Sequence, residues 1–465
     1  MIISRSPPRR GSSVLDDGSR VAVIGGGPAG SLCAYFLLRA AHARGLDLHL
    51  DIYEPRDFTL PGPIGCNMCG GVVSEFLVDA LAAEGITIPQ SVVQRPITSY
   101  IFATDEGSVR IKMPTGDRRI AALHRGAGPR GLIGVQWTGL DGYLLDRAVG
   151  LGARRIARRV DGLDRVAGLP VVRAGGDAAA YDLVVSAAGV NTAIGSLLGR
   201  VGLSAPRPRV TRAYITELPI DSSEIAARIG DAMHIFLLRI PRLEFAAIIP
   251  KRDVLTVCLL GRNIDQEMIK AFFESPPVRR CLGSTPRMPE GICHCAPFIN
   301  IGAVRQPFAD RIVLVGDCGV TRLYKDGVGA AYRTAKAAAA TVLHWGVSEA
   351  DFRAHYWPTY RSIARDNQFG RLLFFGVREF RTLRPWLRGL LSVVAKEQAA
   401  SRHERRMSRV LWDMFTGSAE YRDIFARALD PRLLGPFIWD SVRSAVHGDQ
   451  RLDADVRRAA GEDRH

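Results

Sequence analysis

A glycine-rich turn near the start of this sequence constrains the fold more than any other feature. A short apolar run leads into Gly25, Gly27 and Gly30, and a second apolar run ends on Glu54. Gly25 permits a tight turn, Gly27 lets the backbone approach a pyrophosphate, and Gly30 lets the following helix pack closely on the strand. Glu54, 24 residues beyond Gly30, can accept hydrogen bonds from ribose hydroxyls. The pattern predicts a strand-turn-helix-strand unit that binds the ADP part of a dinucleotide.

A second fingerprint lies late in the chain, where an apolar run over residues 311–315 ends on Gly316 and Asp317. An aspartate at this position can bind a ribityl hydroxyl, and glycines that open the next helix admit a pyrophosphate and a flavin edge to its N-terminus. The late Gly-Asp pair therefore selects FAD. The cofactor-binding residues predicted from the two fingerprints are Gly25, Gly27, Pro28, Ala29, Gly30, Glu54, Gly316, Asp317, Gly327, Val328 and Gly329.

The composition is that of a globular protein with an unusual charge. The 465 residues, 47% of them hydrophobic, suffice for two or three domains. The formal net charge of +15 comes almost wholly from arginine, and either a functional basic surface or a GC-rich genome explains it. We predict no nucleic-acid partner, because the basic stretches lack an RNA-binding or recognition-helix motif. We find neither an export signal nor a run of membrane-spanning length, so we expect a cytoplasmic protein, with peripheral contact to the inner membrane face as an option.

The order of elements predicts an α/β fold: an FAD-binding Rossmann-like domain with an inserted, mainly antiparallel β-sheet substrate domain and a helical C-terminal region. Short β-rich runs begin near residue 209. The C-terminal helices are expected to break near Pro385, Gly417, Pro431 and Pro436. The predicted divisions are a tail at 1–20, the first part of the FAD-binding domain at 21–208 with substrate-domain excursions near 90–135, the sheet domain at 209–300, the returning FAD-binding segment at 301–346, the helical region at 347–447 and a polar tail at 448–465.

Several segments resemble the flavoprotein superfamily of aromatic hydroxylases, flavin halogenases and geranylgeranyl reductases. The early glycine turn, a middle Val-Val-Ser-Ala-Ala-Gly189 run and the late Gly-Asp pair carry this resemblance over residues 21–343. The geranylgeranyl reductase branch is the most similar, because Cys69-Gly-Gly-Val-Val-Ser74 resembles its Cys-Gly-Gly/Asp/Glu-x-x-Ser segment and residues 140–148 resemble its Phe-Asp-x-x-Leu helix. The resemblance implies that Gly70 and Gly71 help to bind the cofactor and that Cys69 lies beside the flavin and a reducible double bond.

The sequence also departs from the patterns of this superfamily. Ala188-Gly189 stands where the aromatic hydroxylases have Asp-Gly, so their mode of NAD(P)H docking is not implied. The electron donor stays open between NAD(P)H and a reduced carrier. The proline that follows the late Gly-Asp pair in the superfamily is absent, and so is the Trp-x-Trp-x-Ile-Pro segment of tryptophan halogenases.

The eight cysteines indicate a reducing compartment and few disulfides. Three interpretations stay open: a single functional Cys69, a redox dithiol of Cys66 and Cys69, or a zinc or iron–sulfur site shared with Cys293 and Cys295. We assign no metal ligands, because the resemblance already accounts for Cys69. Tyr324, just before the flavin-facing helix, either supplies a proton, binds a substrate head group or belongs to a solvated loop. The predicted catalytic residues are Cys69, Cys66 and Tyr324.

Residues 352–409 combine 13 basic and 4 acidic residues with apolar runs at 372–377 and 383–394. Two compatible interpretations remain: helices that lie on an anionic membrane surface, or a helical cap whose apolar face is core. A cap would also provide the long apolar tunnel that an isoprenoid chain needs.

These features predict a monomeric-to-dimeric FAD enzyme that reduces carbon–carbon double bonds of a prenyl, isoprenoid or other apolar substrate by hydride transfer from flavin N5. Two alternatives are a flavin monooxygenase acting on an apolar or aromatic substrate and a membrane-associated flavoprotein electron carrier. The expected partners are an apolar small-molecule substrate, an electron-donor protein and an anionic membrane surface.

Overall fold

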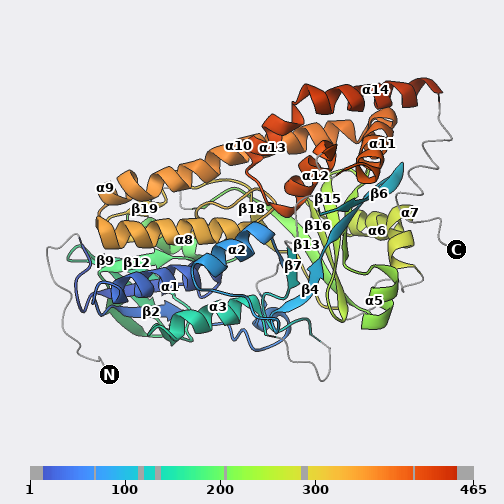
Figure 1. The fold of residues 1–465 in the computed structure, drawn as a ribbon. Helices are drawn as coiled ribbons and strands as arrows, with labels where there is room; N and C mark the ends of the chain where they lie inside the picture. The colour runs from blue at the N-terminus through green and yellow to red at the C-terminus, as the bar shows by residue number, and fades with distance from the viewer. Residues whose placement is uncertain are drawn as a thin grey trace.

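The computed structural model describes residues 14–66, 70–113, 120–130, 138–203, 207–283, 292–401 and 404–447. Figure 1 shows an α/β part that carries the N-terminus, a large sheet beside it, and a layer of C-terminal helices above both. This arrangement confirms the predicted fold class, in which a Rossmann-like domain carries an inserted, mainly antiparallel sheet and a helical C-terminal region.

The sheet of the α/β part is mainly parallel, with strand order β19-β20-β12-β1-β2-β8. Only the edge strand β19 runs antiparallel to its neighbour. The central strands are continuous runs of buried Val, Ile, Leu and Ala, as expected for a sheet covered on both faces. The strands are β1 Arg20–Ile24, β2 His49–Tyr53, β8 Arg154–Ile156, β12 Leu183–Ser186, β19 Phe308–Ala309 and β20 Ile312–Leu314.

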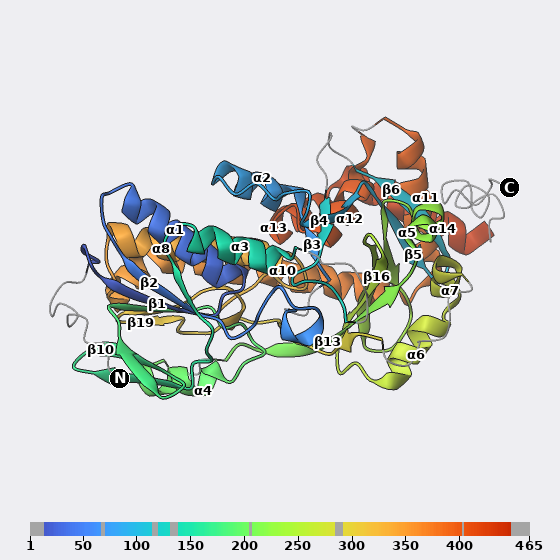
Figure 2. The same cartoon turned by 90° about the horizontal axis from the view of Figure 1, so that it is seen from below.

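Helices cover one face of this sheet, and a small β-sheet with helix α4 covers the other (Figure 2). Helix α1 begins at Pro28, directly after the glycine turn, and packs against α3 and α8. The alanine-rich α8 can approach α1 closely, because Ala335 and Ala338 are fully buried and have no bulk beyond Cβ. These elements are α1 Pro28–His42, α3 Leu140–Val149, α8 Gly327–His344, β9 Gly162–Val166, β10 Leu169–Ala174, β11 Asp177–Ala180 and α4 Ile194–Leu198.

The inserted sheet has strand order β17-β13-β16-β15-β14-β5-β6, and β18 also pairs with β13. It is antiparallel except for β5, which pairs in parallel with β14, so a hairpin from the first part of the chain completes it. Its alternating residues face two cores, one under helices α5–α7 and one under the C-terminal helices. The elements are β5 Ser99–Thr104, β6 Gly107–Lys112, β13 Val210–Pro219, β14 Ala232–Leu237, β15 Leu243–Pro250, β16 Val254–Gly261, β17 His294–Cys295, β18 Phe298–Asn300, α5 Ser222–Arg228, α6 Gln266–Glu274 and α7 Pro276–Leu282.

A small antiparallel sheet, ordered β3-β7-β4, lies between the two large sheets (Figure 1). Helix α2 leaves it at Ser74, whose hydroxyl accepts a hydrogen bond from the Leu77 amide at 3.3 Å. The loop after β7 places His124 and Arg125 where the α/β part and the inserted sheet meet. The elements are β3 Val72–Val73, α2 Glu75–Ala83, β4 Val93–Ile97 and β7 Ile120–Leu123.

The C-terminal helices pack on the inserted sheet and end in α14. The predicted breaks at Pro385, Gly417 and Pro431 are confirmed, because these residues lie in the first turn of α11, at the end of α12 and at the start of α14. The predicted break at Pro436 is wrong, since Pro436 lies inside α14. The carbonyl that loses its N–H donor there belongs to the exposed Arg432, where water can replace it. The helices are α10 Trp357–Phe380, α11 Arg384–Ala399, α12 Arg406–Thr416, α13 Tyr421–Ala428 and α14 Pro431–His447. Within the described ranges, we find no helix with the length and apolarity needed to cross a membrane.

Candidate functional site

The two glycine fingerprints meet at the carboxyl edge of the parallel sheet. Strands β1, β12 and β20 are neighbours and run in the same direction, so Gly25, Gly189 and Gly316 follow their ends at one edge. Gly316 has a φ of +67°, and a Cβ at this position would lie 2.6 Å from the Cβ of Ala29 in the first turn of α1. The early and late glycine turns of the chain therefore pack against each other at this edge.

The N-terminus of α1 carries no side-chain cap. Gly27 is the N-cap residue, and Pro28 occupies the first turn. Backbone amides of this turn and the positive end of the helix dipole are therefore available to an anion. Gly30 fixes the position of the helix, because a Cβ there would lie 1.9 Å from the carbonyl oxygen of Gly25 and 3.0 Å from Cγ1 of Val23.

Glu54 follows β2, and its side chain is hydrogen-bonded to the glycine turn. Its side chain is buried, Oε2 accepts a hydrogen bond from the Gly26 amide at 2.9 Å, and Oε1 accepts one from the Arg56 amide at 2.9 Å. A carboxylate offers about four lone-pair positions. These two bonds therefore leave Glu54 able to accept hydrogen bonds from ribose hydroxyls, as the sequence predicts.

Three polar side chains, those of Thr321, Arg125 and Asn300, interact with Asp317 at the same edge. Burial raises the pKa of its carboxyl, while a hydrogen bond from Thr321 and the positive charge of Arg125 favour the ionised form. Arg125 is positioned in turn by the fully buried Asp141 at the start of α3, with Nη2 3.0 Å from Oδ2. The side-chain amide of Asn300 donates to the Asp317 carbonyl at 2.8 Å. Asp317 is thus a fixed acceptor beside the turn that carries Gly316.

The start of α8 faces this aspartate. A Cβ at Gly327 would lie 3.3 Å from Oγ1 of Thr321 and 3.7 Å from Oδ1 of Asp317, so the first residue of α8 lies beside both side chains. Asp326 caps the helix by accepting a hydrogen bond from the Gly329 amide at 3.1 Å, and burial raises its pKa to about 6. Val328 is buried in this first turn. The predicted Gly327–Gly329 segment therefore lies next to the late Gly-Asp pair.

Gly70 and Gly71 lie against the inserted sheet. A Cβ at Gly70 would come within 2.9 Å of Sγ of Cys258. Gly71 has a φ of +74°, and a Cβ there would lie 1.9 Å from a backbone oxygen of β7 and 3.2 Å from Nζ of Lys251. These glycines thus let the chain cross close to the sheet. Cys69, the predicted reaction centre, lies outside the described residues.

A buried ionic cluster lies next to Gly71. Lys251 is 1% exposed, and its Nζ lies 2.9 Å from Oε1 of Glu217 and 3.2 Å from Nδ1 of His124. Thr256 also donates to Oε1 of Glu217, at 3.0 Å. Burial and the charge of Lys251 lower the pKa of His124, so this imidazole is neutral near pH 7. The cluster places a paired ammonium and a neutral imidazole between the inserted sheet and the end of β7, next to Gly71.

We expect the free energy of unfolding to fall as the pH drops below about 4.5, the ordinary pKa of glutamate. Burial opposes ionisation of Glu217, but the charge of Lys251 and the hydrogen bonds of the cluster hold its pKa well below that value. The unfolded chain therefore takes up the proton first, and the stabilisation by the ion pair is lost. Urea unfolding at about pH 6 and about pH 3.5 should show a smaller loss for Glu217→Gln than for the native chain. Equal losses in the two proteins would contradict the expectation.

The cysteines of the inserted sheet cannot all pair. Cys258 and Cys295 flank Ile215 in three adjacent strands. With strands about 4.8 Å apart, their Cα atoms are separated by roughly 10 Å, beyond the limit of about 7 Å for a disulfide. Burial raises the pKa of Cys295, and the proximity of Cys66 raises it further, so these two thiols lie in one neighbourhood.

The interpretation of the cysteines as a zinc or iron–sulfur site finds no support among the residues that can be described. In that part of the chain, no group of three or more His, Cys, Asp or Glu side chains is arranged to hold a metal ion. Cys293 and His294 enter the inserted sheet at β17, where the Cys293 carbonyl accepts a hydrogen bond from the Glu217 amide at 3.1 Å. The His294 side chain is exposed. The pair of Cys66 and Cys69 is not described as a unit, because Cys69 lies outside the described residues.

Tyr324 lies in an aromatic cluster at the start of α8. It has a φ of +61° and makes edge-on ring contacts with Phe245 and Phe374, with centroids 6.1 and 5.0 Å away. Nζ of Lys325 lies 4.6 Å from the ring centroid of Phe245. Burial raises the pKa of Tyr324 to about 12, so the phenol keeps its proton at neutral pH. The cluster therefore places the protonated phenol of Tyr324 beside the apolar rings of Phe245 and Phe374.

Sequence reasoning missed Lys251, Glu217, His124 and Arg125. The only available signal was that Lys251 is one of six lysines and stands at the end of a strand-like apolar run. Glu217 and His124 lie in unrelated segments, 34 and 127 residues from Lys251. Their meeting depends on the pairing of β13 with β16 and on the small sheet that carries β7.

Comparison with known proteins defines the fold. No protein-family model and no curated protein matches the sequence. The fold is that of Rossmann-type flavoenzymes. A solved structure of a geranylgeranyl bacteriochlorophyll reductase-like protein from Thermoplasma acidophilum has a TM-score of 0.61 and 14% identity, covering 92% of this chain and 100% of that one.

Two further solved structures share the fold. For 2-methyl-3-hydroxypyridine-5-carboxylic acid oxygenase the TM-score is 0.55 and the identity 16%, over 79% of this chain and 92% of that one. For a flavin-dependent brominase the TM-score is 0.54 and the identity 13%, over 96% of this chain and 98% of that one. Because identities are this low, the likeness establishes architecture and leaves the reaction to be argued from the residues.

Proposed function

We propose that the chain is an FAD-dependent oxidoreductase. The observation that carries the proposal is the meeting of the two glycine turns, where Gly316 lies against Ala29. The donor set there fits FAD: uncapped amides at the start of α1 suit a pyrophosphate, and the carboxylates of Glu54 and Asp317 suit ribose and ribityl hydroxyls. The named activities of the three similar structures, a reductase-like protein, an oxygenase and a brominase, support the same coarse class.

We further propose reduction of a carbon–carbon double bond in a prenyl or other apolar substrate. FAD, when bound and reduced, supplies a hydride for such a reaction. The aromatic side chains of Phe245, Phe374 and Tyr324 offer an apolar surface beside the start of α8. Tyr324 holds a proton on its hydroxyl at neutral pH and can donate it to the second alkene carbon. The Cys69-Gly-Gly resemblance and the likeness to the reductase-like structure, with its TM-score of 0.61, support this choice.

The neighbouring polar groups have separate roles in this proposal. Arg125 and Asp141 fix the environment of Asp317, which binds and orients the cofactor. Cys66 is a half-buried thiol near Cys295, and its proposed role is that of the partner of Cys69 in a redox dithiol. The electron donor is NAD(P)H or a reduced carrier.

The test uses the purified full chain. A denatured extract is expected to show the absorbance and mass of FAD. After reduction with dithionite under argon, mixing with geranylgeraniol should reoxidise the flavin and yield a product heavier by two hydrogens. Tyr324→Phe should slow this step by about 10²-fold, as expected when a proton donor is lost. Cys69→Ala should slow it as well, because the resemblance implies that Cys69 lies beside the flavin and the reducible double bond.

Cys281→Ala is the matched control, because Cys281 lies in α7 on the far side of the inserted sheet and should not affect the rate. Absence of bound flavin would overturn the oxidoreductase proposal. Flavin reoxidation that needs oxygen, with an oxygenated product, would replace the reductase by a monooxygenase. Reoxidation by quinones with no organic product would instead identify an electron carrier.

A further inference from the structure

Helix α14 presents apolar side chains to solvent. Along Pro431–His447 the exposed positions include Ile438 at 48%, Trp439 at 69%, Val442 at 55% and Val446 at 70%. Their spacing of one, four and eight residues from Ile438 puts them on one face of the helix. An ordinary surface helix turns such a face toward the protein core. Here the large apolar face is directed outward.

Polar contacts lock α14 in this orientation. Asp440 is 3% exposed and accepts hydrogen bonds from Ser392 at 2.8 Å and from Lys396 at 2.8 and 2.6 Å, both on α11. Ser441 packs against α11 as well, and a Cβ at Gly389 would lie 2.2 Å from its Oγ. If α14 rotated to bury its apolar face, the ion pair of Asp440 with Lys396 would break and the close contact of Ser441 with Gly389 would be lost. The outward apolar face is therefore a fixed feature of the fold.

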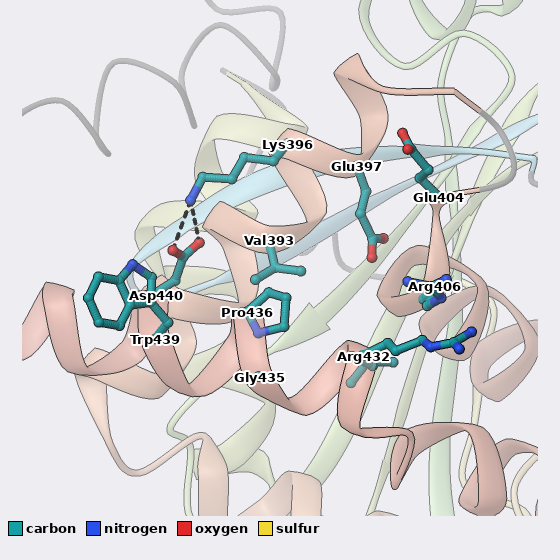
Figure 3. A pocket seen from close by; sticks show the side chains of 11 residues that line it. Val393, Lys396, Glu397, Glu404, Arg406, Arg432, Gly435, Pro436, Trp439 and Asp440 are labelled. Carbon is teal, nitrogen blue, oxygen red and sulfur yellow. Dashed lines mark hydrogen bonds and ion pairs between the residues drawn. The ribbon is translucent and has the colours of Figure 1, made fainter.

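A groove runs beside this face between α11, α12 and α14 (Figure 3). Its volume is about 520 Å³, and it combines the apolar Pro436 and Trp439 with the exposed guanidinium groups of Arg406 and Arg432. Figure 3 shows Trp439 beside the Lys396–Asp440 ion pair, with the two arginines toward the other end of the groove. Three carboxylates line the groove as well: Asp440 is paired with Lys396, Glu397 accepts hydrogen bonds from the Met407 and Ser408 amides of α12, and Glu404 is exposed. The exposed charges of the groove are therefore two guanidinium groups and one carboxylate, which leaves a small positive excess.

Two further apolar side chains are exposed at the turn between α10 and α11. Phe380 is 44% exposed and Leu383 is 49% exposed. The ring of Phe380 stacks on Trp386 with centroids 5.2 Å apart, and both rings contact Phe437 of α14. The turn between α10 and α11 therefore packs against the buried side of α14.

We propose that the exposed apolar face of α14, with Arg406 and Arg432 beside it, binds the interface of an anionic lipid bilayer. Trp and aliphatic side chains enter the boundary between head groups and acyl chains, while arginines pair with lipid phosphates. Charge favours this occupant, because the chain carries a net charge of +15. The C-terminal tail, residues 448–465, is a poor cover, since Leu452 and Val456 are its only large apolar residues.

The test is co-sedimentation of the full chain with extruded vesicles of phosphatidylcholine, with and without about 30% phosphatidylglycerol. The native chain is expected to bind the anionic vesicles and to bind the neutral ones far more weakly. The double variant Trp439→Glu/Val442→Glu should weaken binding at least about tenfold, because two inserted apolar side chains become charged. Arg406→Gln and Arg432→Gln should each cost about fivefold on anionic vesicles only.

Val166→Glu is the matched control, since Val166 is 57% exposed at the end of β9 in the α/β part and should bind like the native chain. Thermal unfolding of each variant checks that these exposed substitutions leave the fold intact. Equal binding of the native chain and Trp439→Glu/Val442→Glu would overturn the proposal. So would a dimer, measured by light scattering, that this double variant dissociates. Because binding needs no turnover, this outcome is independent of the proposed reaction.

Discussion

Replacing Lys251 with methionine is expected to lower the free energy of unfolding by about 3–5 kcal/mol. Methionine keeps the length and most of the packing of the side chain but removes the ammonium group. Glu217 then loses its hydrogen bond of 2.9 Å in a site where Lys251 is 1% exposed. A buried carboxylate without its cation must either remain poorly solvated or take up a proton. Both outcomes destabilise the folded state, and urea unfolding at neutral pH measures the loss.

Two further variants separate this effect from a general loss of charge. Lys270→Met removes an ammonium that is 74% exposed and 3.9 Å from Glu274, and should change stability by less than about 0.5 kcal/mol. The double variant Lys251→Met/Glu217→Gln should recover part of the loss, because it no longer buries an unpaired charge. A cost below about 1 kcal/mol for Lys251→Met would show that water reaches the cluster.

Gly30→Ala is expected to weaken the proposed binding of FAD by at least about tenfold and to lower the free energy of unfolding by about 2 kcal/mol. The added Cβ would lie 1.9 Å from the carbonyl oxygen of Gly25, a backbone atom that cannot rotate away. The amide of Gly25 is held by the Tyr53 carbonyl at 2.9 Å, so the turn cannot yield easily either. Helix α1 must then move off β1. Alanine is the better helix former by about 1 kcal/mol, so this loss occurs against the intrinsic preference.

The matched control for this glycine is Gly199→Ala. Gly199 has a φ of −61° at the end of α4, and a Cβ there meets nothing within 4 Å. FAD content after denaturation and a urea titration of both variants provide the comparison. If Gly30→Ala retains the native FAD content and stability, then the close contact of α1 with the turn does not support cofactor binding.

Much of the fold could be predicted because its signals are local. The run at residues 210–218 became β13, and the helix expected after Gly139 became α3. Glycines that must turn or approach a neighbour, such as Gly25 and Gly30, mark their positions without any partner residue. The prediction at Pro436 failed because proline disfavours a helix only where its missing hydrogen bond cannot be replaced, and Arg432 is exposed to water.

The ionic cluster could not be predicted, because none of its members has a local signature. Lys251, Glu217 and His124 come from three strands or strand ends, and their distances depend on strand register. The same holds for Arg125, which meets Asp141 and influences Asp317 across three separate segments. A sequence shows that such groups are charged, but only the packed chain decides which of them are neighbours.

The sequence by itself determined the positions of the glycine turns and of the acids that follow them, because the spacing of these residues is a property of each continuous segment. It also determined that the C-terminal helices are amphipathic and basic. Only the tertiary structure decided which face of each helix is covered. Leu387 and Leu391 of α11 are buried against the inserted sheet, whereas Trp439 and Val446 of α14 face outward. Helical periodicity defines a face, but partner contacts such as the ion pair of Asp440 decide the direction in which that face points.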